Sequence, residues 1–126
     1  MYKISEQQFE QIVQEAVESL PETHRSKIKN MGFFVRQLPS IEQARKAGLR
    51  PGMTLFGLYE GIPLSQRNGA SMVMPDMITI FQEPIEYRSN DLKELRQHVK
   101  HTVWHEVAHY FGLNHKQIYD IEDKRK

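Results

Sequence analysis

The chain has 126 residues, enough for one domain with a buried core and too few for a second. Its 17 Lys and Arg balance 16 Asp and Glu, so the formal net charge of +1 gives no general attraction to nucleic acid or anionic lipid. The absence of cysteine excludes a disulfide scaffold and thiolate zinc sites. We therefore expect a single domain over residues 1–126 whose partners are selected by a local site.

The N-terminal segment, MYKISEQQFEQIVQEAVESLPE, is polar from its start and contains no apolar core of signal-peptide type. No stretch approaches the ~18 apolar residues of a membrane span. We expect a cytoplasmic protein, monomeric by default, with no membrane partner and no nucleic-acid partner.

An amphipathic helix is predicted from Ser5 to Leu20. Ser5 and Gln8 form a capping-box pattern, and Pro21 ends the helix. The apolar residues at helical spacing, which predict the buried face, are Phe9, Ile12, Val13, Ala16, Val17 and Leu20.

Two short strands are predicted next. The first is Phe33–Val35, bounded by Gly32 and Pro39, and its partner is expected to be far away in sequence. The second is MTLFGLYEG, residues 53–61. Between them, Ser40 and Gln43 predict a capped short helix that Gly48 closes.

A third strand is predicted over Met77–Gln82, after an irregular segment from Ile62 to Asp76 that is rich in Gly, Pro and Asn. Its β-branched and aromatic residues favour a strand, and the nearby Pro84 favours a position at the edge of a sheet.

The last predicted element is a helix from Asp91 to about Phe111. Asp91 and Glu94 give a cap pattern, and Gly112 is placed to end the helix. One apolar stripe, which should pack on the rest of the domain, consists of Leu92, Leu95, Val99, Val103, Val107 and Tyr110. His105 and His109 lie together on the flank beside this stripe.

The spacing of three histidines predicts a metal site. His105 and His109 are four residues apart, so their rings project from the same side of the helix and can converge on one ion. His115 would be rotated ~240° away if the helix continued, so the helix must stop before it. Gly112 supplies that stop because glycine enters the left-handed region without steric cost.

Three protein ligands leave the fourth position of a tetrahedral zinc ion open, which is typical of a catalytic site. Glu106 follows the first ligand and is placed to accept a proton from water there. Among the other histidines, His98 lies on the same flank but ~10 Å along the axis, and His101 is expected to point to a different side. His24 lies in a polar loop.

The segment HEVAHYFGLNH, residues 105–115, matches HExxHxxGxxH, the metzincin-type signature of zinc endopeptidases. FEQIVQEAVESLPE, LFGLYEGIPLSQR, MPDMITIFQEPIE and VKHTVWHEVAHYFGLNH together resemble, in order and spacing, the small bacterial zincin-like metallopeptidase family, sometimes called minimal metalloproteases. The likeness extends from about residue 8 to residue 115. One departure is that no methionine follows Met77, where metzincins have a methionine turn beneath the metal.

The resemblance implies Zn²⁺ bound by His105, His109 and His115, with Glu106 as the catalytic general base. It also implies an α+β fold, a small zincin-like domain in which an N-terminal helix and a C-terminal active-site helix pack on a short mixed β-sheet.

The leading interpretation is a zinc-dependent metallopeptidase that hydrolyses peptide bonds of a peptide or protein substrate, using water activated by zinc and by Glu106. We expect the edge of the third strand, Ile78, Thr79, Ile80 and Phe81, to bind an extended peptide by strand addition. The alternatives are a zinc-dependent hydrolase of a non-peptide substrate, RNA, and a non-catalytic zinc-binding interaction module. Glu106 and the near-neutral charge disfavour RNA.

Overall fold

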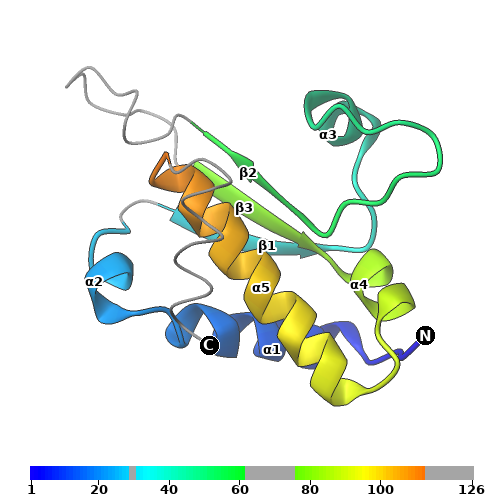
Figure 1. The fold of residues 1–126 in the computed structure, drawn as a ribbon, viewed down its shortest axis with the longest axis horizontal. Coiled ribbons are helices and arrows are strands. Elements are labelled where there is room, and N and C mark those ends of the chain that lie inside the picture. Colours follow the sequence, from blue (N-terminus) through cyan, green and yellow to red (C-terminus); the bar gives the residue numbers. More distant parts are fainter. Residues whose placement is uncertain (29–30, 62–75, 113–126) are drawn as a thin grey trace.

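The computed structural model describes residues 1–28, 31–61 and 76–112, and its helices and strands follow one another along these segments (Figure 1). In chain order they are α1 (Glu6–Glu18), α2 (Glu22–Arg25), β1 (Met31–Arg36), α3 (Ile41–Lys46), β2 (Gly57–Glu60), β3 (Asp76–Phe81), α4 (Gln82–Arg88) and α5 (Leu92–Tyr110). The predicted α+β class, with an N-terminal helix and a long C-terminal helix on a short mixed sheet, is confirmed.

The sheet has the strand order β1-β3-β2, with β1 parallel and β2 antiparallel to β3. Val35 of β1 is in register with Ile80 of β3, so the first strand does pair with one distant in sequence, as predicted. Because a parallel partner requires a crossover connection, everything between β1 and β3 must fold back before this pair can form.

The prediction of an edge position for the third strand is wrong, because β3 lies between β1 and β2 and pairs with both. Its residues Ile78, Thr79, Ile80 and Phe81 are at most 2% exposed. A peptide therefore cannot add to β3, and these four side chains are not available to a substrate. Pro84 gave the misleading signal: it lies in the first turn of α4, where an amide has no partner within the helix, and not in the strand.

The hydrophobic core lies between one face of the sheet and the helices α1 and α5, which contact each other across it (Figure 1). Most of its members belong to the predicted helix stripes or to the sheet, and Ile85, Trp104 and Ala108 join them. The full set is Phe9, Ile12, Val13, Ala16, Leu20, Val35, Ile78, Ile80, Ile85, Leu95, Val99, Val103, Trp104, Val107 and Ala108. Of the stripe predicted for α5, Leu92 alone is exposed. The core therefore holds one side of α5 against the sheet and leaves the adjacent flank to carry the histidines.

Most helix ends follow the predicted capping patterns. The Ser5 hydroxyl accepts from the Gln8 backbone amide, and the Ser40 hydroxyl accepts from that of Gln43, each completing a capping box. The Asp91 carboxylate accepts from the amide of Glu94 at 2.8 Å and caps α5.

Three features differ from the predicted elements. The second strand is limited to Gly57–Glu60, and the short helices α2 and α4 were not predicted. Of the predicted irregular segment Ile62–Asp76, only Asp76 lies within the described residues, and it begins β3. Across the segments that the structure describes, no helix is long and apolar enough to cross a membrane.

Candidate metal centre

The last two turns of α5 bring His105 and His109 together. Their ring centroids lie 4.8 Å apart, and the potential ligand atoms of these histidines and of Glu106 all lie within 4.8 Å of one another. Two nitrogens bound to one tetrahedral zinc ion are separated by ~3.4 Å, so modest side-chain rotation brings both imidazoles onto one ion. Imidazole nitrogens are ligands that suit zinc.

The helix ends where the sequence predicts. Phe111 is its C-cap, Gly112 has a φ of 78°, and the Gly112 N–H donates to the His109 carbonyl at 2.9 Å. The chain thus leaves the helical path directly after the second histidine. The predicted third ligand, His115, lies outside the described residues, and its role stays a prediction.

Glu106 is buried beside the two imidazoles. Its Oε1 accepts a hydrogen bond from the backbone N–H of Tyr59, in β2, at 2.9 Å. Burial raises the pKa of the Glu106 carboxyl to about 7, and the Tyr59 hydrogen bond opposes this rise without cancelling it. Glu106 can therefore exchange a proton near neutral pH.

A cleft of about 300 Å³ opens beside His105 and Glu106, between α5 and the segment that leads into β2. Among the described residues, its lining consists of Thr54, Leu55, Phe56, Gly57, His101, Thr102, His105 and Glu106. The cleft gives a substrate access to the carboxylate and to the first histidine.

His101 belongs to this cleft, so the expectation that it points to a different side of the helix is wrong. Its ring stacks on that of His105, with centroids 6.2 Å apart and planes 27° apart. The reason is that residues four apart on a helix are only ~40° apart around its axis. His98, in contrast, contacts the Phe56 ring and has its Nδ1 2.9 Å from the Ser89 hydroxyl.

Tyr59 and Gly57 are the site residues that sequence reasoning missed. Tyr59 contacts the Glu106 carboxylate across 47 positions of sequence, and its ring also meets Tyr110 edge to face. Both residues lie in LFGLYEGIPLSQR, one of the segments that carry the family resemblance, but the resemblance assigned no role to either. Their roles depend on the packing of β2 against α5, and no local sequence pattern predicts that contact.

A long helix that carries two histidines and a carboxylate beside a mixed sheet defines a zincin-type domain. The model of the zincin-like metallopeptidase family matches residues 28–125. This match covers most of the chain, so the protein belongs to the zincin-like metallopeptidase family. A comparison with curated proteins gives no match. The family and the cluster of His105, Glu106 and His109 together imply a metal ion at this end of α5.

Proposed function

We propose that the protein is a zinc-dependent metallopeptidase in which His105, His109 and His115 bind the metal and Glu106 is the general base. The main support for this proposal is the position of the Glu106 carboxyl group. It is buried, within 4.8 Å of both imidazoles, and has a pKa of about 7. A carboxyl whose pKa is close to the working pH is suited to accept and return a proton.

A bound zinc ion would supply Lewis acidity, polarising the scissile carbonyl and acidifying water. Glu106 takes a proton from the attacking water and passes it to the leaving amine. Since Oε1 of Glu106 already accepts from the Tyr59 amide, Oε2 is the atom that handles the proton. His105 and His109 would hold the metal beside the Glu106 carboxylate, since the potential ligand atoms of all three residues lie within 4.8 Å of one another.

The cleft beside His105 supports a peptide substrate more than RNA. Its lining, over the part of the chain that the structure describes, contains no lysine or arginine to neutralise phosphates. The outer strand next to this cleft is β2, which replaces β3 as the strand beside which an extended peptide would lie.

Metal content and substrate class test the proposal together. Purified protein loaded with zinc is analysed for bound metal by mass spectrometry and incubated with casein and, separately, with single-stranded RNA. We expect one zinc per chain and cleavage of casein only. His105→Ala and His109→Ala should lose most of the bound zinc. His101→Ala, one turn away on the same flank, is the matched control and should keep it.

Each alternative has its own signature in this experiment. Cleavage of RNA without cleavage of casein would favour the ribonuclease reading. Full zinc occupancy without any hydrolysis, unchanged in Glu106→Gln, would favour an interaction module. Equal loss of zinc from His101→Ala and His105→Ala would contradict the assignment of the ligands.

A further inference from the structure

Strand β2 lies close to α5 at Gly57, its first residue. A Cβ atom placed on Gly57 would lie 2.6 Å from Cγ2 of Thr102 and 3.3 Å from Cγ of Glu106. Real Cβ atoms essentially never approach another atom to 2.6 Å, so a side chain here would require the Thr102 side chain to turn or β2 and α5 to shift. The absence of a side chain at Gly57 therefore sets how near the strand lies to the Glu106 side chain.

Two residues further along β2, the Tyr59 N–H donates to Glu106 Oε1. In an antiparallel pair, the backbone groups of alternate residues point toward the partner strand and away from it. The Phe81 N–H donates to the Phe56 carbonyl, so the backbone groups of Phe56 point toward β3 and those of Gly57 and Tyr59 point away from β3. Gly57 and Tyr59 are also in register with Ile80 and Ile78, whose side chains lie in the core between the sheet and α5. The two contacts with Glu106 thus come from one side of a single strand.

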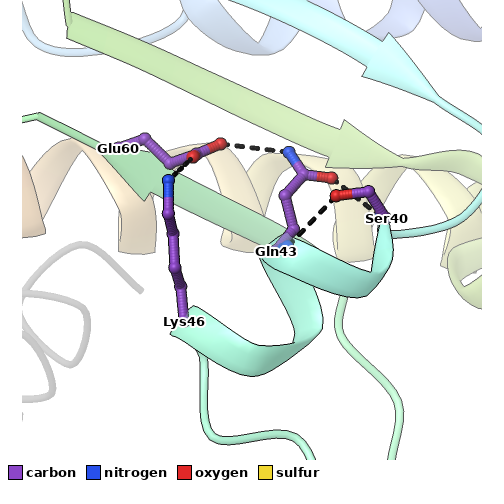
Figure 2. Close-up of polar contacts among 4 residues, drawn as sticks. All are labelled: Ser40, Gln43, Lys46 and Glu60. Carbon is purple, nitrogen blue, oxygen red and sulfur yellow. Dashed lines mark hydrogen bonds and ion pairs between the residues drawn. The ribbon is translucent and has the colours of Figure 1, made fainter.

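Strand β2 is itself held by side-chain contacts at its C-terminal end, at Tyr59 and Glu60. The Tyr59 hydroxyl donates to Oδ1 of Asp76 at 3.0 Å, and Asp76 is buried. Glu60 accepts from the Gln43 side-chain amide at 3.0 Å and from Lys46 at 2.9 Å, both on α3 (Figure 2). The strand is therefore a fixed reference against which Glu106 can be aligned.

We propose that Gly57 and Tyr59 are positioning residues for Glu106: Gly57 by leaving room for the helix and Tyr59 by holding one carboxylate oxygen with its backbone amide. The inference rests on the proposed role of Glu106 as general base. A one-ångström displacement of a catalytic group can cost on the order of 100-fold in rate. A strand shifted outward by a methyl group should therefore impair turnover while the helix still presents both histidines.

Amide hydrogen exchange of Tyr59 tests the geometry without metal or activity. In the metal-free wild type, NMR should show the Tyr59 amide protected, because Glu106 Oε1 accepts from it. Protection should fall at least about tenfold in Glu106→Asp, whose shorter side chain cannot reach, and in Gly57→Ala. Glu106→Asp also keeps the inference testable if Gly57→Ala fails to fold.

A compensating variant isolates the contact at Gly57. Thr102→Ser removes the methyl group that the new Cβ would strike and keeps a hydroxyl for the His98 carbonyl, which Thr102 contacts at 2.6 Å. Gly57→Ala should lower kcat by about 10- to 100-fold with zinc content and KM nearly unchanged. Gly57→Ala with Thr102→Ser should recover most of that loss relative to Thr102→Ser alone. Leu58→Ala, whose side chain points to the opposite face, is the strand control.

The outcomes separate this inference from the proposed function. If the wild type holds zinc and hydrolyses nothing, the proposed function fails, while Tyr59 protection still reports the geometry. If the wild type is active and Gly57→Ala keeps both its rate and its Tyr59 protection, the positioning role is overturned. A double variant as impaired as Gly57→Ala, with zinc and fold intact, would also overturn it.

Discussion

Two carboxylates are held at neighbouring residues of β2, and their protonation is driven in opposite directions. Glu60 is partly exposed and accepts from Gln43 and Lys46, and these two donors lower its pKa. Glu106 is buried and accepts from the Tyr59 backbone amide, and burial raises its pKa to about 7.

The difference shows that contact with β2 does not by itself determine the pKa of a carboxyl group. Among the described residues, Glu60 is partly exposed and pairs with the Lys46 ammonium, whereas Glu106 is buried and accepts from the neutral Tyr59 backbone amide. A partly exposed carboxylate with a cation stays ionised and fastens α3 to β2. A buried one with a single neutral donor becomes a group that exchanges its proton near pH 7.

Replacing Glu106 and, separately, Glu60 by glutamine should have very different effects on the rate of peptide hydrolysis. Glu106→Gln should lower kcat/KM for peptide hydrolysis by about 10²- to 10⁴-fold, because an amide cannot accept the proton of water. Bound zinc should remain. Glu60→Gln should have a far smaller effect, and steady-state kinetics of both zinc-loaded variants provides the comparison. Undiminished turnover in Glu106→Gln would disprove the base assignment.

Glu106→Gln should increase the stability of the metal-free protein, although it lowers the rate of catalysis. A folded-state pKa raised from 4.5 to about 7 means that the penalty for burying charge is absent below pH 4.5 and complete above pH 7. Glu106→Gln, which keeps an acceptor for the Tyr59 amide, should raise the free energy of unfolding at pH 8 by on the order of 1–3 kcal/mol. Urea unfolding in EDTA at pH 8 and pH 4 measures this, and equal effects at both values would argue against it.

We expect the smallest effect from Glu60, the partly exposed carboxylate, on the free energy of unfolding. The lowered pKa of Glu60 means that its stabilisation is present above pH 4.5 and is lost as the pH falls through its folded-state value. Glu60→Gln should therefore destabilise the protein at pH 7 by less than about 1 kcal/mol, and by a smaller amount at pH 3. Urea unfolding at the two pH values is the measurement. A larger loss at pH 3 would contradict the sign of this contribution.

Local signals in the sequence predict the helices and the metal-binding turn well. The capping boxes at Ser5 and Ser40, the stop at Gly112 and the placement of His105 beside His109 each depend on a few consecutive residues. Such patterns act through contacts within one or two turns, so the sequence alone contains the necessary information.

Strand order and the surroundings of Glu106 depend on contacts between distant segments, and there the sequence was less informative. One usable signal was overlooked: DMITIF, residues 76–81, does not alternate between apolar and polar residues, which is typical of a strand covered on both faces. Nothing local indicates that Gly57 faces Thr102, because that contact arises only once β2 and α5 are both in place.

The central position of β3 has a consequence for how the chain folds. Within the described residues, β1 and β2 do not pair with each other, so both lack a native neighbour until β3 is added between them. Unpaired strands invite mispairing, and contacts between distant segments slow folding. We expect Glu106 to reach its Tyr59 contact only once β2 is fixed in the sheet, so this carboxyl would be aligned late in folding. Refolding from denaturant should consequently be slow, with the metal-binding end of α5 among the last regions to reach its native surroundings.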